Sequence, residues 1–115
     1  MAVSGEFRDF VEDQLSGFGP VTVRPMFGGA GIFHDGLMFG LIADETLYLK
    51  VDDTNRDAFE AEGSEPMLYV KNGKSMAMSY WRLPERLYED PDEMTSWARA
   101  AFAVAVKAKK PKSRR

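Results

Sequence analysis

Apolar residues recur along this chain with two different periods. Phe7, Phe10, Val11 and Leu15 follow helical spacing, and Gly17 ends the segment that carries them. Shorter segments further along the chain alternate apolar and polar side chains, which is typical of half-buried strands. The pattern predicts the order α-β-β-β-β-α-β-β-α. It places helices at about 4–15, from 52 or 53 to just before 63, and from about 90, with strands between them that include 21–25, 67–71 and 74–81.

Tight turns connect the predicted strands. Asp35-Gly36 and Asn72-Gly73 favour two-residue hairpins, since both positions of such a turn take positive φ. A third turn lies at Ala43–Thr46. The first turn pairs Phe33 with Met38 and Ile32 with Phe39. Short turns indicate an antiparallel meander, which with the helices gives a two-layer α+β fold.

Side-chain alternation sorts the strands into two faces. One face is purely apolar and is the predicted core, made of Phe33, Met38, Ile42, Leu47, Leu49 and Val51. The other face is rich in methionine and tyrosine, which suit adaptable contacts. Its candidate interface residues are Phe39, Leu41, Tyr48, Tyr69, Met76 and Met78. We therefore expect a protein partner or self-association, with coverage by a helix or by the C-terminal segment as the alternative.

Composition narrows the classes of function. The 115 residues fit one domain, predicted at 1–106, and the absence of cysteine excludes disulfides and thiolate chemistry. The sequence shows no signal peptide and no apolar stretch long enough to span a membrane. We expect a cytoplasmic protein with no membrane association.

No residue pattern supports catalysis, a cofactor or a metal. The segment Phe27–Phe33 is glycine-rich, but a strand follows it where a phosphate loop requires a helix, so we interpret the glycines as a bend. His34 is the single histidine and is expected to be a solvated turn residue. Acidic residues cluster at turns and helix starts, where capping explains them. We expect no catalytic residues, no cofactor and no bound metal.

Charge is distributed unevenly. Residues 1–106 hold 9 basic and 18 acidic side chains, a net charge of −9, whereas the segment 107–115 is basic. We expect this tail to be disordered, and its alternative role is weak, salt-sensitive contact with nucleic acid. The candidate contacts are Lys107, Lys109, Lys110, Lys112, Arg114 and Arg115.

Several motifs together resemble the TfoX/Sxy N-terminal domain family. The first is Arg24–Phe33, and later segments are Phe39–Ile42, Leu47–Val51, Ser79–Pro84 and Asp90-Pro91. The resemblance covers about residues 4–106. The residues of this chain that match the family's motifs are Arg24, Met26, Phe27, Gly28, Gly29, Gly31, Tyr80, Trp81 and Pro84.

The resemblance implies an antiparallel two-layer α/β fold and a non-enzymatic regulatory role. The implied role is similar to that of the competence regulators, which act with a cyclic-AMP receptor protein to switch on DNA-uptake genes. Regulators of that type carry a second, helical C-terminal domain, whereas this chain has a basic segment at that place. Our first hypothesis is therefore an interaction module. The alternatives are a nucleic-acid-associated protein that uses the tail and a small-ligand-binding domain or enzyme with a pocket near Arg24.

Overall fold

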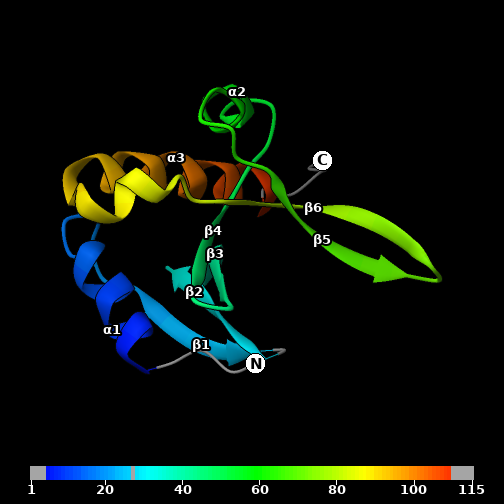
Figure 1. Ribbon diagram of the computed structural model, residues 1–115. Coiled ribbons are helices and arrows are strands. Elements are labelled where there is room, and N and C mark those ends of the chain that lie inside the picture. The colour runs from blue at the N-terminus through cyan, green and yellow to red at the C-terminus, as the bar shows by residue number, and fades with distance from the viewer. Residues whose placement is uncertain (1–4, 27, 110–115) are drawn as a thin grey trace, which may run out of the picture.

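The computed structural model describes residues 5–26 and 28–109, and it confirms the predicted α+β order (Figure 1). A short 3-10 helix, η1, adds to that order before the last helix. The elements are α1 (Gly5–Gln14), β1 (Thr22–Met26), β2 (Gly29–His34), β3 (Leu37–Ala43), β4 (Thr46–Lys50), α2 (Arg56–Ala61), β5 (Pro66–Lys71), β6 (Lys74–Arg82), η1 (Glu85–Glu89) and α3 (Pro91–Lys109).

All six strands form one antiparallel sheet with the order β1-β2-β3-β4-β6-β5. The predicted turns are confirmed. Gly36 and Gly73 have φ values of 79° each, and the preceding Asp35 and Asn72 also lie in the left-handed region. The sheet has no strand pairing that closes it, so it is open at both edges.

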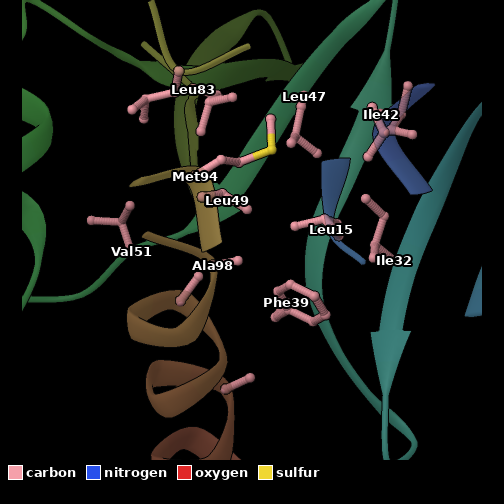
Figure 2. Close-up of a cluster of buried hydrophobic side chains, with 14 of the residues drawn as sticks. Leu15, Ile32, Phe39, Ile42, Leu47, Leu49, Val51, Leu83, Met94 and Ala98 are labelled. Atoms are coloured by element: carbon pink, nitrogen blue, oxygen red, sulfur yellow. The ribbon is translucent and has the colours of Figure 1, made fainter. Parts of the chain in front are cut away.

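The helices lie on one face of this sheet. Side chains from all three α-helices join one buried cluster with side chains from β2, β3 and β4. Val11 of α1, Phe59 of α2 and Ala98 of α3 belong to it, and each is at most 1% exposed. Figure 2 shows Met94 and Ala98 of α3 beside this part of the sheet. The sheet and helices therefore make the two layers expected from the sequence.

A β-bulge corrects the predicted faces of the first hairpin. Phe33 pairs with Met38 as expected, but Ile32 pairs with Gly40, so Phe39 is an extra residue on β3. The predicted pairing of Ile32 with Phe39 is wrong. Beyond the bulge the alternation restarts, and both Ile32 and Phe39 are fully buried among core side chains (Figure 2). Phe33 and Met38 pair with each other on the opposite face.

Aromatic packing around His34 corrects a second expectation. Its ring lies 5.0 Å from the Phe18 ring and 4.9 Å from the Phe102 ring, and its Nδ1 donates to the Pro20 carbonyl at 2.6 Å. The prediction that His34 is a solvated turn residue is therefore wrong. His34 links the β2–β3 turn to α3, because its packing partners come from distant segments.

The second helix also begins later than predicted. Helix α2 begins at Arg56 and is preceded by Asn55, whereas Asp52 accepts a hydrogen bond from the Thr54 backbone at 2.8 Å. Asp52 therefore organises the turn before the helix. Within α2, Ala58 is exposed and Phe59 is buried. The last helix begins at Pro91 as expected, and the Asp90 carboxylate accepts from the Glu93 backbone at 3.1 Å.

Strand β6 belongs to the main sheet along only part of its length. Its Tyr80–Arg82 segment pairs with β4, and the rest pairs with β5 alone. In Figure 1 the β5–β6 hairpin projects away from the helices and from strands β1–β4. We call the projecting part, residues 67–78, the hairpin arm. Within the described part of the chain, no helix is long and apolar enough to cross a membrane.

Candidate interaction surfaces

The face of the sheet opposite the helices is the first candidate surface, and we call it the open sheet face. The register of paired strands determines which residues share it, because alternate side chains point to opposite sides. Its apolar, aromatic and basic side chains range from the buried Tyr80 to the exposed Arg24 and Arg82. They are Arg24, Met26, Phe33, Met38, Leu41, Tyr48, Lys50, Tyr80 and Arg82.

Two cations on the open sheet face lie over aromatic rings. The Arg24 guanidinium carbon is 5.1 Å from the centre of the Phe33 ring, and the Lys50 Nζ is 4.9 Å from that of Tyr80. Tyr80 is 8% exposed, and burial raises the pKa of its hydroxyl above the ordinary value of 10.0. Its hydroxyl donates to the Met38 carbonyl at 3.4 Å. This network orders side chains from four different strands.

The hairpin arm provides the second candidate surface. Leu68 is 60% exposed, Val70 is 71% exposed, Tyr69 is 44% exposed and Met76 is 42% exposed. Tyr69 and Met76 are direct cross-strand partners, and Leu68 pairs with Ala77. We call these four exposed side chains the hairpin surface. A solvent-exposed strand pair that carries apolar side chains on both faces is a strong indicator of an interaction site.

The structure divides the interface residues predicted from sequence into four groups. Tyr69 and Met76 lie on the hairpin surface, and Leu41 and Tyr48 lie half-buried on the open sheet face. Met78 is half-buried on β6. Phe39 is the correction, because it is fully buried and cannot meet a partner. Sequence reasoning did not single out Leu68 and Val70, although the Asn72-Gly73 turn and their alternation with Tyr69 could have found them.

Most residues of the family motif have a structural role. Gly28 has a φ of 78° in the β1–β2 turn, and a Cβ on Gly29 would lie 2.1 Å from the Ile42 carbonyl oxygen. The Trp81 ring is 6.3 Å from the Phe59 ring, and Pro84 is buried directly before η1. Gly28 therefore lies in the predicted bend, whereas Gly29 and Gly31 belong to strand β2.

Four motif positions belong to the open sheet face, namely Arg24, Met26, Gly31 and Tyr80. A Cβ on Gly31 would lie 3.2 Å from Met26 Sδ and 3.0 Å from Met38 Sδ, so larger side chains fill the space above this glycine. Arg24 is exposed on the same face. Phe27 lies outside the described residues.

Two of the candidate nucleic-acid contacts belong to helix α3, which extends to Lys109. Lys107 Nζ is 2.8 Å from an Asp52 carboxylate oxygen, and Lys109 is exposed. The domain boundary at 106 stays a prediction. The four remaining candidates lie outside the described residues. They are Lys110, Lys112, Arg114 and Arg115.

The Asp52–Lys107 contact predicts a dependence of stability on pH. The Lys107 hydrogen bond, and then that of Thr54, lower the pKa of Asp52 from 3.8 to about 2. A lowered folded-state pKa stabilises the fold above pH 3.8, and this contribution is lost as pH falls through about 2. We expect Asp52→Asn to lower the urea midpoint at pH 7, with the difference from the parent protein shrinking towards pH 2.

Asp57→Asn is the matched control for this pH prediction. Asp57 is an exposed carboxylate in the first turn of α2, and it makes no contact with Lys107. Its substitution should leave the urea midpoint nearly unchanged at pH 7. An Asp52→Asn effect that is equally large at pH 7 and pH 2 would show that the contact stabilises the fold without its charge.

Charged side chains line a polar cleft in the described part of the chain. Residues 5–26 and 28–109 contain no cluster of three or more histidine, cysteine or acidic side chains that could hold a metal. A polar cleft of about 270 Å³ lies between the start of β4, the end of α2 and η1. Its Arg82 pairs with Glu65 at 3.2 Å, and its Glu62 pairs with Arg86 at 2.7 Å. The cleft is not lined by Arg24, so it is not the pocket suggested by the sequence.

Comparisons with known proteins agree with this geometry. A family model described as the TfoX N-terminal domain matches residues 13–105. The chain is 22% identical over 104 residues to Protein Sxy of Escherichia coli (strain K12), covering 90% of this chain and 50% of that protein. It is 30% identical over 84 residues to DNA transformation protein TfoX1 of Aliivibrio fischeri (strain ATCC 700601 / ES114), covering 73% of this chain and 40% of that protein.

The chain thus spans half or less of the length of these two relatives. The range matched by the family model begins within α1 and ends within α3. It therefore includes all six strands, and with them both candidate surfaces.

Proposed function

Because the chain belongs to the TfoX N-terminal domain family, we propose that it is a non-enzymatic regulatory module that acts by contact with a protein partner. Two relatives support the regulatory part, since one is named a DNA transformation protein and both share this domain. The control of DNA-uptake genes is the role that we transfer from the family. With this role we propose a cytoplasmic location.

The hairpin surface is the observation that carries the proposal. Four large apolar side chains are each more than 40% exposed within one short two-stranded arm. On the β4 side, residues 79–82 hold the arm to the body, through pairing with β4 and a hydrogen bond that the Val51 N–H donates to the Ser79 carbonyl at 2.8 Å. The exposed apolar residues of the arm therefore contribute little to the core. Apolar surface that does not stabilise the fold is best explained by burial against a partner. Tyrosine and methionine are enriched at the centres of such interfaces.

The test uses the full chain and a paired substitution. Tyr69→Ala combined with Met76→Ala removes a cross-strand pair from the hairpin surface. We expect the double variant to bind at least tenfold more weakly, since tyrosine anchors at an interface centre often contribute about 2 kcal/mol or more. Isothermal titration against purified cyclic-AMP receptor protein measures one candidate partner. Light scattering over a concentration series measures self-association.

Val106→Ala is the matched control for this pair. Val106 is 47% exposed on α3, away from the arm, so its truncation removes exposed apolar surface of a similar kind. Binding should be unchanged in this variant. A parent protein that stays monomeric and ignores the receptor protein would contradict the proposal, and so would a double variant that binds like the parent.

A further inference from the structure

The two layers of this protein carry opposite charge. All 18 acidic residues lie outside the six strands, in helices, turns and connecting segments. The strands contain five arginine and lysine residues and no acidic residue. These cations are Arg24, Lys50, Lys71, Lys74 and Arg82. The net charge of −3 therefore conceals basic strands and acidic helices, with Asp35, Asp44 and Glu45 in the turns at the ends of the strands.

Three of these cations share the open sheet face with three aromatic rings. Arg24 lies over Phe33, and Lys50 lies over Tyr80. Tyr48 lies between them on β4, directly opposite Leu41 on one side and Arg82 on the other. Because neighbouring strands are about 4.8 Å apart, the rings on β2, β4 and β6 span roughly 14 Å. The described helices all pack against the other face, so this row has no helix over it.

From this arrangement we propose that the open sheet face binds single-stranded nucleic acid. Flat aromatic side chains and guanidinium groups on an antiparallel sheet provide surfaces on which bases stack, and neighbouring cations attract the phosphates. One or two bases can stack on this face, because Tyr80 is 8% exposed and the Phe33 ring is covered by Arg24. Duplex DNA is the poorer ligand, because its bases are already stacked and are read by elements that enter a groove.

The contacts within the face indicate how binding occurs. Cation–π pairing already holds Arg24 and Lys50 over the rings, so their charges are positioned before a ligand arrives. A base can stack on the exposed side of the Arg24 guanidinium or on the half-buried Tyr48 ring. Glu65 is the acidic group that pairs with a cation of this face, at 3.2 Å from Arg82. We therefore assign the main phosphate contacts to Arg24 and Lys50.

Fluorescence anisotropy with a labelled 12-residue oligothymidylate tests this proposal, using the full chain in 50 mM and 200 mM salt. We expect Tyr48→Ala to weaken binding about tenfold through the loss of stacking. Arg24→Glu should also weaken binding about tenfold, and should reduce the slope of log K against log salt by about 0.7 for the phosphate contact it removes.

Arg8→Glu is the matched control, since it makes the same charge change on α1 in the helical layer. Its affinity should stay within twofold of the parent value. A chain ending at Lys109 should also keep its affinity, because the proposed site is on the sheet. Circular dichroism melting establishes that each variant is folded, and Tyr69→Ala with Met76→Ala should bind the oligonucleotide normally.

Three results would overturn the assignment. The parent protein would fail to bind oligothymidylate at 50 mM salt, or it would bind a 12-base-pair duplex as tightly as the single strand. Alternatively, removal of residues 110–115 would abolish binding while Tyr48→Ala and Arg24→Glu leave it unchanged, which would locate the contact in the basic tail. None of these results bears on the hairpin surface, whose variants are measured against protein partners.

Discussion

Replacing Phe39 with alanine is expected to lower the free energy of unfolding by about 3–5 kcal/mol. The ring is fully buried, lies 5.0 Å from the Phe18 ring in a stacked arrangement, and meets the Phe102 ring edge-on at 5.8 Å. Truncation leaves a cavity between the sheet and α3 that neighbouring rings cannot fill without leaving their rotamers. Urea denaturation followed by circular dichroism measures the loss.

Met76→Ala is the comparison that makes the Phe39 result informative. Both residues were candidates for the same interface, but Met76 is 42% exposed on the hairpin arm. Its truncation should change the unfolding free energy by no more than about 0.5 kcal/mol. If Phe39→Ala lowered the unfolding free energy by less than about 1 kcal/mol, this would contradict the bulge register and indicate that Phe39 lies on the opposite face.

Gly29→Ala is the second substitution with a large expected effect, a loss of about 3 kcal/mol or more of unfolding free energy. The added Cβ would lie 2.1 Å from the Ile42 carbonyl oxygen and 3.3 Å from the Ile42 carbonyl carbon. Backbone atoms of a paired strand cannot move aside as a flexible side chain can. The β2–β3 ladder must therefore separate at this end, where Ala30 pairs with Ile42. Thermal melting and urea denaturation both report the change.

Gly5→Ala is the matched control for Gly29→Ala. Gly5 begins α1, and among residues 5–26 and 28–109 no atom beyond its chain neighbours and its own helix backbone lies within 4 Å of an added Cβ. Alanine there should stabilise the helix slightly, by up to about 1 kcal/mol, because glycine loses more backbone freedom on folding. Equal effects at the two positions would show that the close approach of β2 and β3 does not exist.

The sequence predicts local structure well where one residue type has a clear physical preference. Asp35-Gly36 and Asn72-Gly73 form the turns that their tolerance of positive φ favours. Asp90-Pro91 begins α3 for an equally local reason, since aspartate caps and proline fits the first helical turn. The antiparallel order of strands follows from these short connections.

Bulges and splayed strands depend on tertiary packing, which strict alternation does not include. Ile32 and Phe39 lie in the core because the bulge places one more residue on β3, and Phe33 and Met38 consequently lie on the open sheet face. The separation of the hairpin arm from β4 has a similar origin, since the pairing of β6 with β4 is limited to Tyr80–Arg82 and does not extend to Met78. No local pattern in the sequence specifies either position.

The sequence predicted which residue types form the candidate surfaces better than it predicted where those residues lie. Tyrosine and methionine residues did indicate exposed surface at Tyr69 and Met76. The charge separation between layers could have been found only after the strands were assigned, because the acidic residues are spread along the whole chain. It becomes visible when Arg24, Lys50 and Arg82 are placed on neighbouring strands.

The limited attachment of the hairpin arm has an evolutionary consequence. Residues added or removed in pairs at the Asn72-Gly73 tip preserve the two-residue period of the strands, so every remaining side chain keeps its face. The length and sequence of the arm can thus change under selection for a new partner while the folding of the body is inherited unchanged. In such a molecule, divergence of binding specificity and conservation of the fold proceed on separate segments of one chain.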